Sequence, residues 1–298
     1  MVADASWSRL PGWQLRLIAG LFPVGLTPGS SVSIQVLVEV LVSVELSFNE
    51  YGAGPPVVIL HGLFGSKRNW SSIARQLAPD FHVYAVDLRN HGESPWHEQH
   101  DYPAMAVDVA HLIEQQVGQP VTLIGHSMGG KVAMYLALTR PDLVERLVVV
   151  DIPPARSRGT PISYVHAMQA VPLAQFSRRS EVEQALAETI ADPVVRGFLV
   201  TNIISVPEGL AWTVNLDAIE RQFDTILDWP AAAAGWQFSG QTLFIRGNRS
   251  AFIKPEHEAI IRQLFPAAMT ESVIGAGHWV HAEQPAAFLE SVQRFLAG

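Results

Sequence analysis

A serine flanked by glycines stands where a short apolar run gives way to a helical pattern. The sequence GHSMG at residues 125–129 follows the apolar residues 121–124, and the helical pattern continues to residue 139. A G-x-S-x-G turn between a strand and a helix projects the serine above the sheet, at the positive end of the helix dipole. Glycines on either side avoid collisions with the neighbouring backbone. The motif predicts Ser127 as a nucleophile, and the alternative is a glycine-rich turn with an idle serine.

The composition limits the classes of protein to which this chain can belong. The chain has 298 residues, of which 48% are hydrophobic, and this suffices for one large domain or one domain with an insertion. The absence of cysteine excludes disulfides, a thiolate nucleophile and cysteine metal sites. A net charge of −8 argues against a nucleic-acid partner, which would need a basic face. No uncharged apolar run is long enough to predict a membrane span, and no particular oligomeric state is predicted.

The N-terminal segment is predicted to lie outside the folded domain. Residues 13–26 are apolar but include Arg16 and Pro23, and Asp4 precedes them where a signal sequence would be positively charged. We interpret residues 1–33 as an extension without a catalytic role. The predicted location is cytoplasmic, and the apolar stretch leaves export or membrane association open.

Strand and helix patterns alternate over residues 34–152 and again over 239–298. This alternation predicts an α/β core with a mostly parallel, eight-stranded sheet flanked by helices. Residues 31–50 alternate apolar and polar side chains, which is typical of one or two antiparallel strands at a sheet edge. Helical periodicity dominates residues 153–238, so we predict a helical lid, inserted before the last two strands and covering the sheet edge where ligands bind.

His278 is the candidate base. It lies in GAGHW at residues 275–279, directly after the last predicted strand and therefore after the nucleophile in the chain. Imidazole can take up and return a proton near neutral pH. A solvated loop histidine is the alternative interpretation, and His281 is the nearby rival. The two histidines have no evident third partner for a metal ion.

The candidate acid is Asp151, which follows an apolar strand. The segment after the next core strand, residues 244–250, contains no carboxylate, whereas Glu256 and Glu258 fall within a predicted helix. A carboxylate at the end of a buried strand needs a partner, and there it could orient the imidazole of His278. The alternative is that Asp151 caps the turn before two prolines.

Two further sets of residues complete the predicted site. The loop HGLFG at residues 61–65 follows an apolar strand, so we assign the oxyanion-hole N–H groups to Leu63 and Met128. Aromatic and aliphatic side chains of the lid are candidates for the substrate pocket, and plain lid core is the alternative. These candidates are Phe198, Trp212, Phe223 and Ile226.

From about residue 46 onward, the chain resembles the α/β-hydrolase superfamily, and more narrowly the YbfF-type bacterial carboxylesterases. The resemblance rests on HGLFGS at 61–66, DLRNHGES at 87–94, GHSMGGK at 125–131, VVDI at 149–152 and GAGHWVHAEQP at 275–285. It implies hydrolysis of short-chain acyl esters without a cofactor, and it places the acid at Asp151. The extension at the N-terminus departs from the family pattern.

These observations predict a serine carboxylesterase with a triad of Ser127, His278 and Asp151, acting on a small-molecule ester. A thioesterase or an acyltransferase would use the same triad. A ligand receptor on a hydrolase scaffold is the alternative from a different class. Dehalogenases and epoxide hydrolases are disfavoured, because proteins of those types that resemble this fold carry aspartate where Ser127 stands.

Overall fold

Seven strands form one sheet in the computed structural model, which describes residues 43–157, 162–233 and 235–298. The predicted extension at residues 1–33 lies outside these ranges. In sheet order the strands are β1 (Phe48–Tyr51), β3 (His82–Val86), β2 (Pro56–Leu60), β4 (Val121–His126), β5 (Val144–Val150), β8 (Gln241–Gly247) and β9 (Ala268–Val273). Edge strand β1 pairs antiparallel with β3, and all other pairs are parallel. The predicted fold class is confirmed, with seven strands among the described residues where eight were predicted.

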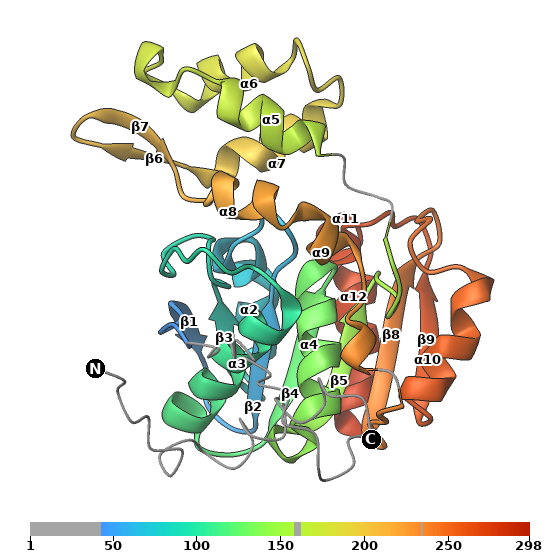
Figure 1. The fold of residues 1–298 in the computed structure, drawn as a ribbon. Coiled ribbons are helices and arrows are strands. Elements are labelled where there is room, and N and C mark those ends of the chain that lie inside the picture. Colours follow the sequence, from blue (N-terminus) through green and yellow to red (C-terminus); the bar gives the residue numbers. More distant parts are fainter. Residues whose placement is uncertain (1–42, 158–161, 234) are drawn as a thin grey trace, which may run out of the picture.

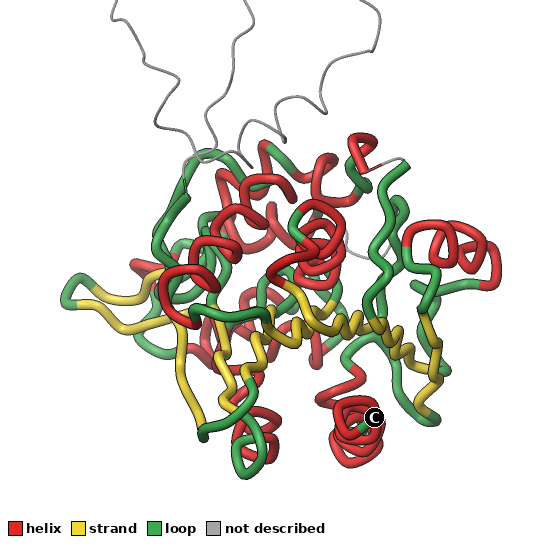
Figure 2. The backbone as a smooth tube through the Cα atoms, turned by 90° about the horizontal axis from the view of Figure 1, so that it is seen from below, coloured by secondary structure: helices red, strands yellow, loops and turns green. Residues whose placement is uncertain are grey.

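The central strands are apolar because both faces of the sheet are covered. Every residue of β2 and β4 is buried, as expected for parallel strands between two helix layers. Figure 2 shows helices on both sides of the sheet. One layer contains α2 (Ser71–Leu77), α11 (Val280–Glu283) and α12 (Pro285–Ala297). The other contains α3 (Tyr102–Leu112), α4 (Met128–Thr139) and α10 (Glu258–Leu264).

A second group of elements connects β5 to β8, and we call residues 162–233 the insert. It contains α5 (Ser163–Ala170), α6 (Arg179–Leu186), α7 (Pro193–Leu199), β6 (Ile203–Val206), β7 (Gly209–Trp212), α8 (Leu216–Arg221) and α9 (Phe223–Leu227). Strands β6 and β7 form an antiparallel hairpin, so the insert is not purely helical as predicted. The sequence carried the signal for this hairpin, a β-branched run followed by a turn at Pro207, Glu208 and Gly209.

The remaining described elements are short. They are 3-10 segments at Lys67–Trp70, Pro141–Leu143, Leu173–Gln175, Val200–Asn202, Ala231–Ala233 and Pro255–His257, and a π-helical turn at Ile113–Val117.

The insert stands beyond the carboxyl ends of the parallel strands (Figure 1). Side chains of the core form hydrogen bonds with the end of α9 in the insert. The Tyr102 hydroxyl donates to the carbonyl oxygen of Ile226, and Lys131 Nζ donates to those of Leu227 and Asp228 at 2.8 Å each. On the insert side, Asn202 Nδ2 donates to Phe64 O at 2.7 Å. These bonds place the insert directly over the loops that follow the strands.

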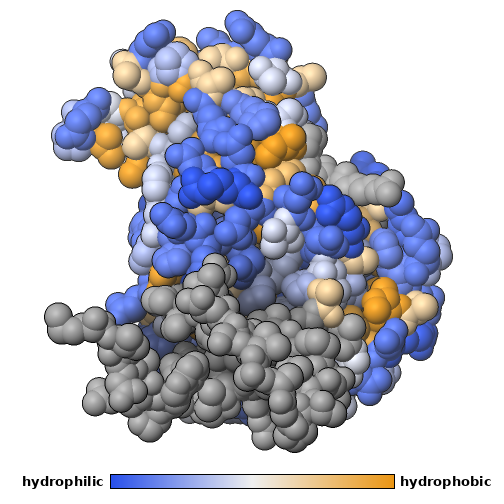
Figure 3. Space-filling view, in the orientation of Figure 1, coloured by the Kyte–Doolittle hydropathy of each residue, from blue (hydrophilic) through white to orange (hydrophobic). Residues whose placement is uncertain are grey.

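The surface of the described residues is mixed. Where described residues of the core are visible in Figure 3, they are mainly hydrophilic, and hydrophobic side chains are more frequent over the insert. Within the described ranges, no helix has both the length and the apolar character needed to cross a membrane.

Candidate active site

Ser127 occupies a sharp turn between β4 and α4. Its backbone has φ of 51° and ψ of −119°, a strained conformation for a residue with a side chain. A Cβ added at Gly125 would lie 2.2 Å from Gly129 O, and one added at Gly129 would lie 2.4 Å from His61 O. Both clashes involve backbone atoms that cannot rotate away, so the turn requires the two glycines of the motif.

The register of the sheet makes Ser127 and Asp151 neighbours. His126 ends β4 and pairs with Val150, which ends β5, so the next residue of each strand emerges at the same edge. The Ser127 N–H donates to Val150 O at 3.0 Å. Asp151 is fully buried and has φ of 53°. The structure thus brings together two predicted site residues that are separated by a whole helix in sequence.

Residues with strained backbone conformations lie together at this edge of the sheet. The described residues include four non-glycine residues with positive φ, and each lies in the loop after one of four parallel strands. They are Phe64 after β2, Asn90 after β3, Ser127 after β4 and Asp151 after β5. Strained backbone of this kind costs about 1–3 kcal/mol per residue and is concentrated at functional sites.

His278 reaches the same edge from the loop after β9. Its Nδ1 lies 2.8 Å from Asp151 Oδ2. An ionised carboxylate only accepts hydrogen bonds, so Nδ1 carries a proton and the neutral ring has its lone pair on Nε2. This is the tautomer that a base acting on a serine hydroxyl requires.

Ser250 supports the carboxylate from the loop after β8. Its hydroxyl donates to Asp151 Oδ2 at 2.5 Å, and the Gly247 N–H donates to Oδ1 at 3.2 Å. The sequence analysis noted only that this loop lacks a carboxylate. A lone loop serine has no pattern in sequence, and its role becomes visible only through the register of β5 and β8.

Ser127 and His278 line the same cavity, although no hydrogen bond joins their side chains in the described structure. Bonds between a nucleophile and its base are often long before substrate binds and shorten in the complex. The cavity therefore brings a hydroxyl and an imidazole together, and the imidazole is bonded through Nδ1 to the buried carboxylate of Asp151.

Two backbone N–H groups near Ser127 remain available. In the loop after β2, the Phe64 N–H donates to His91 Nε2 and the Gly65 N–H to Gly62 O, whereas the Leu63 N–H donates to no described residue. Met128 is the first residue of α4, so its N–H has no acceptor within the helix. Neither predicted oxyanion donor, Leu63 or Met128, therefore has its N–H bonded to an acceptor among the described residues.

Buried neutral histidines surround the site. Burial lowers the pKa of His61 to about 4, and its Nε2 accepts from the Leu88 N–H at 3.0 Å. Burial likewise lowers the pKa of His281 to about 3, and its ring stacks on Trp70 at 4.0 Å. His126 Nε2 donates to the carbonyl oxygen of His278 at 2.9 Å. These rings brace the loops, which leaves His278 as the histidine paired with a carboxylate here.

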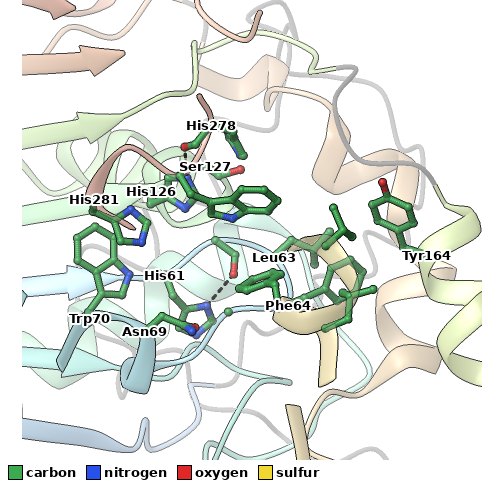
Figure 4. A pocket seen from close by; sticks show the side chains of 16 residues that line it. His61, Leu63, Phe64, Asn69, Trp70, His126, Ser127, Tyr164, His278 and His281 are labelled. Carbon is green, nitrogen blue, oxygen red and sulfur yellow. Dashed lines mark hydrogen bonds between the residues drawn. The ribbon is translucent and has the colours of Figure 1, made fainter. Parts of the chain in front are cut away.

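The cavity has a volume of about 60 Å³ and lies between the core loops and the insert (Figure 4). Its core side includes Leu63, Phe64, Ser127 and His278, and Trp279 extends the wall. The insert contributes Tyr164, Val195, Phe198 and Leu199. Within the described ranges, no group of three or more histidine, aspartate or glutamate side chains is arranged to hold a metal ion.

Of the four predicted pocket residues, only Phe198 lines this cavity. Trp212 lies in β7, where its indole N–H donates to Met168 O, and Phe223 and Ile226 are buried in the hydrophobic core. Those three predictions are therefore wrong for this cavity. Helical periodicity identifies the apolar face of a lid helix but does not say whether that face meets the core or the substrate.

Known proteins match this chain over most of its length. Residues 57–291 match the family model described as the alpha/beta hydrolase family. The chain is 41% identical to the sn-1-specific diacylglycerol lipase ABHD11 of Mus musculus, with 82% of this chain and 81% of the mouse protein covered. It is 34% identical to the esterase YbfF of Escherichia coli (strain K12), with 81% and 92% covered. Among solved structures, a marine microorganism esterase has a TM-score of 0.81 and 36% identity, covering 85% of this chain and all of that one.

Proposed function

Because the chain belongs to the alpha/beta hydrolase family, we propose that it is a serine carboxylesterase that cleaves short-chain acyl esters through an acyl-enzyme intermediate. The observation that carries this proposal is the bond between His278 Nδ1 and Asp151 Oδ2 at the edge where Ser127 projects. The likeness to esterase YbfF supports placement among carboxylesterases of that type.

In the first half of the reaction, Ser127 Oγ attacks the ester carbonyl carbon while His278 Nε2 takes its proton. The carbonyl oxygen becomes an anion that accepts hydrogen bonds from the Leu63 and Met128 N–H groups. The C–O bond to the alcohol then breaks, and His278 returns the proton to the leaving alkoxide. Asp151 stabilises the imidazolium that exists between these two proton transfers.

In the second half, a water molecule gives a proton to His278 and attacks the acyl carbon bound to Ser127. The same two amides hold the second tetrahedral anion. Its collapse releases the carboxylic acid, and His278 reprotonates Ser127 Oγ. The proposed steps need no cofactor.

The size of the cavity supports a short acyl group. A volume of about 60 Å³ holds only a few water molecules. Phe64, Phe198 and Leu199 contribute apolar surface to its lining, which suits an alkyl group more than a charged one. We propose that residues 153–238 act as the lid and limit the length of the chain that enters.

A lipase acting on diacylglycerol is the second candidate, favoured by the 41% identity to the mouse enzyme of that name. Long acyl chains exceed a volume of about 60 Å³, so this function would require either a wider cavity or an acyl chain that extends beyond the cavity mouth. Thioesterase and acyltransferase activities remain alternatives on the same residues.

The test uses purified protein with p-nitrophenyl acetate, butyrate and palmitate, a diacylglycerol and an acyl thioester. We expect rapid turnover of acetate and butyrate, and labelling of Ser127 by a fluorophosphonate. Ser127→Ala should lower kcat by at least about 10⁴-fold. Ser72→Ala, which changes an exposed serine on α2, should leave kcat unchanged.

Each other outcome assigns a different function. Preference for the palmitate ester and the diacylglycerol would favour the lipase, and preference for the thioester would favour a thioesterase. Formation of a new ester when an alcohol is added would favour an acyltransferase. Ligand binding without turnover or labelling would contradict the enzyme proposal altogether.

A further inference from the structure

An aromatic ring lies flat against the imidazole of His278. The ring centroids of Phe252 and His278 are 3.9 Å apart and the planes differ by 14°, a stacked geometry. The His126 ring lies 4.7 Å from that of His278 and is tilted by 45°. Phe252 is half-buried and packs against the core. One face of the imidazole is therefore covered by the π surface of a phenylalanine.

The loop after β8 fixes both partners of this arrangement. Phe252 donates its backbone N–H to Ser250 Oγ at 3.2 Å, and Ser250 Oγ donates to the carboxylate of Asp151. Asp151 in turn accepts from His278 Nδ1. The ring of Phe252 thus contacts the face of the imidazole, and the carboxylate of Asp151 contacts its edge. Ser250 is bonded to both partners.

We propose that Phe252 is a positioning residue that stabilises the protonated imidazole of His278 through a cation–π contact. The inference rests on the proposed function, because the imidazolium forms only when His278 takes a proton from Ser127 or from water. The face of a benzene ring carries negative potential, so it attracts a cation stacked against it more strongly than it attracts a neutral ring. The contact therefore strengthens as the proton is transferred, and it contributes to kcat more than to binding.

The other charged and titratable groups around His278 should not mask the effect of Phe252 on the pH profile. Asp151 carries the negative charge bonded to the ring. His126 and His281 are neutral near pH 7, because burial lowers the pKa of His126 well below its ordinary value and that of His281 to about 3. Glu283 accepts from the Trp279 N–H and pairs with Arg249 at 3.0 Å. None of these groups is altered by a substitution of Phe252.

The first experiment compares Phe252→Leu with Phe252→Tyr and Phe252→Trp, with p-nitrophenyl butyrate as substrate. Leucine keeps an apolar side chain but lacks the π face, so kcat should fall about twofold to fivefold while KM stays near its wild-type value. The acid limb of the pH profile of kcat/KM should move about 0.4 to 0.7 units lower. Tyrosine and tryptophan should restore both quantities.

The direction in which the acid limb of kcat/KM moves distinguishes a cation–π role of Phe252 from a role in packing alone. Without the π face the imidazole is harder to protonate, so the base stays neutral to lower pH. A merely structural role would admit water beside the ring, favour its charged form and move the limb upward. An upward or absent shift in Phe252→Leu, or failure of tyrosine and tryptophan to restore the rate, would overturn the proposal.

A second measurement covers the case in which Phe252→Leu folds poorly. Phenylalanine analogues with one, two and three ring fluorines at position 252 keep the shape of the ring and weaken its negative face stepwise. We expect kcat to decline with each added fluorine, and a flat series would contradict the proposal. The control is Phe81→Leu, which changes a half-buried phenylalanine directly before β3, in the hydrophobic cluster that includes α2 and α12. This substitution should leave the pH profile unchanged.

Failure of this inference differs from failure of the proposed function. If the wild-type protein turns over no ester and Ser127 is not labelled by fluorophosphonate, the proposed function is wrong. If wild-type turnover and labelling are normal while Phe252→Leu matches the wild type in kcat and in its acid limb, only the role of Phe252 is wrong.

Discussion

The carboxylate of Asp151 and the imidazole of His278 meet across a sequence separation of 127 residues, with 2.8 Å between Oδ2 and Nδ1. Asp151 is fully buried, whereas the side chain of His278 is 19% exposed at the cavity. A buried carboxylate that accepts three hydrogen bonds is a fixed acceptor, so it dictates which nitrogen of the ring holds the proton.

Replacing this carboxylate with an amide should disable the base without unfolding the protein. In Asp151→Asn, the side-chain NH₂ can donate to the ring and favour the tautomer that presents N–H to Ser127. We expect kcat for p-nitrophenyl butyrate to fall by about 10³-fold or more. The thermal unfolding midpoint serves as the control, and a folded variant within about tenfold of wild-type kcat would exclude Asp151 from the triad.

The glycines provide a matched pair of substitutions. A Cβ at Gly129 meets His61 O at 2.4 Å, whereas a Cβ at Gly197 in α7 meets nothing within 4 Å. Gly129→Ala should lower the free energy of unfolding by about 1–3 kcal/mol and reduce kcat. Gly197→Ala should raise it by about 0.5–1 kcal/mol, because alanine restricts the unfolded chain and favours the helix. Urea unfolding measures both free energies. Equal effects would show that the backbone around the turn between β4 and α4 moves to make room for the added methyl group.

The buried histidines should make the protein sensitive to acid. Burial lowers the pKa of His61 to about 4 and the pKa values of His91 and His281 to about 3. Between these values and the ordinary 6.5, the unfolded chain binds more protons than the folded one, so the free energy of unfolding falls as pH falls. Urea unfolding at several pH values below 6.5 should show this slope.

A single substitution tests the origin of that slope. His281→Phe keeps the stack on Trp70 and removes one titrating group, so the slope should decrease by about one proton. An unchanged slope would mean that His281 stays uncharged on unfolding or titrates normally in the fold.

Lys131 should give a pH dependence of the same sign, because its protonated amine is also a buried cation. Burial lowers the pKa of its amine to about 7. Between pH 7 and its ordinary value of 10.5, the unfolded chain holds a proton that the folded protein has lost, so this contribution to stability grows as pH rises. It is lost as pH falls through about 7.

The expected comparison is between the wild type and Lys131→Met at pH 6 and pH 9. The free energy of unfolding of the wild type should rise relative to that of the variant as pH increases. Lys131→Met should also loosen the chain at the end of α9, because the carbonyl oxygens of Leu227 and Asp228 each lose the hydrogen bond from Lys131 Nζ. Faster hydrogen exchange near these residues measures that loss, and equal pH dependence in both proteins would contradict the prediction.

The core fold could be predicted because its signals are local and repeated. Each buried strand is a short apolar run, and the order of strands and helices fixes a parallel sheet. The candidate triad residues follow strand ends, so the topology alone brings Ser127, Asp151 and His278 to one edge. The carboxylate missing after β8 also directed attention to Asp151.

The lining of the cavity could not be predicted in the same way. Tyr164, Val195 and Leu199 look like Phe223 and Ile226 in sequence, because all are apolar residues of short amphipathic helices. Which of them faces the cavity depends on how the insert docks through contacts such as Asn202 to Phe64. Long-range docking of this kind leaves no periodic trace in the chain.

The left-handed backbone at Phe64, Asn90, Ser127 and Asp151 has a consequence for engineering the protein. Glycine would relax each of these positions, yet at Ser127 and Asp151 it would delete the hydroxyl proposed to react or the carboxylate proposed to orient His278. Selection for heat resistance alone would therefore accumulate changes at this edge that silence the enzyme, and a thermostable variant must gain its stability from elsewhere in the molecule.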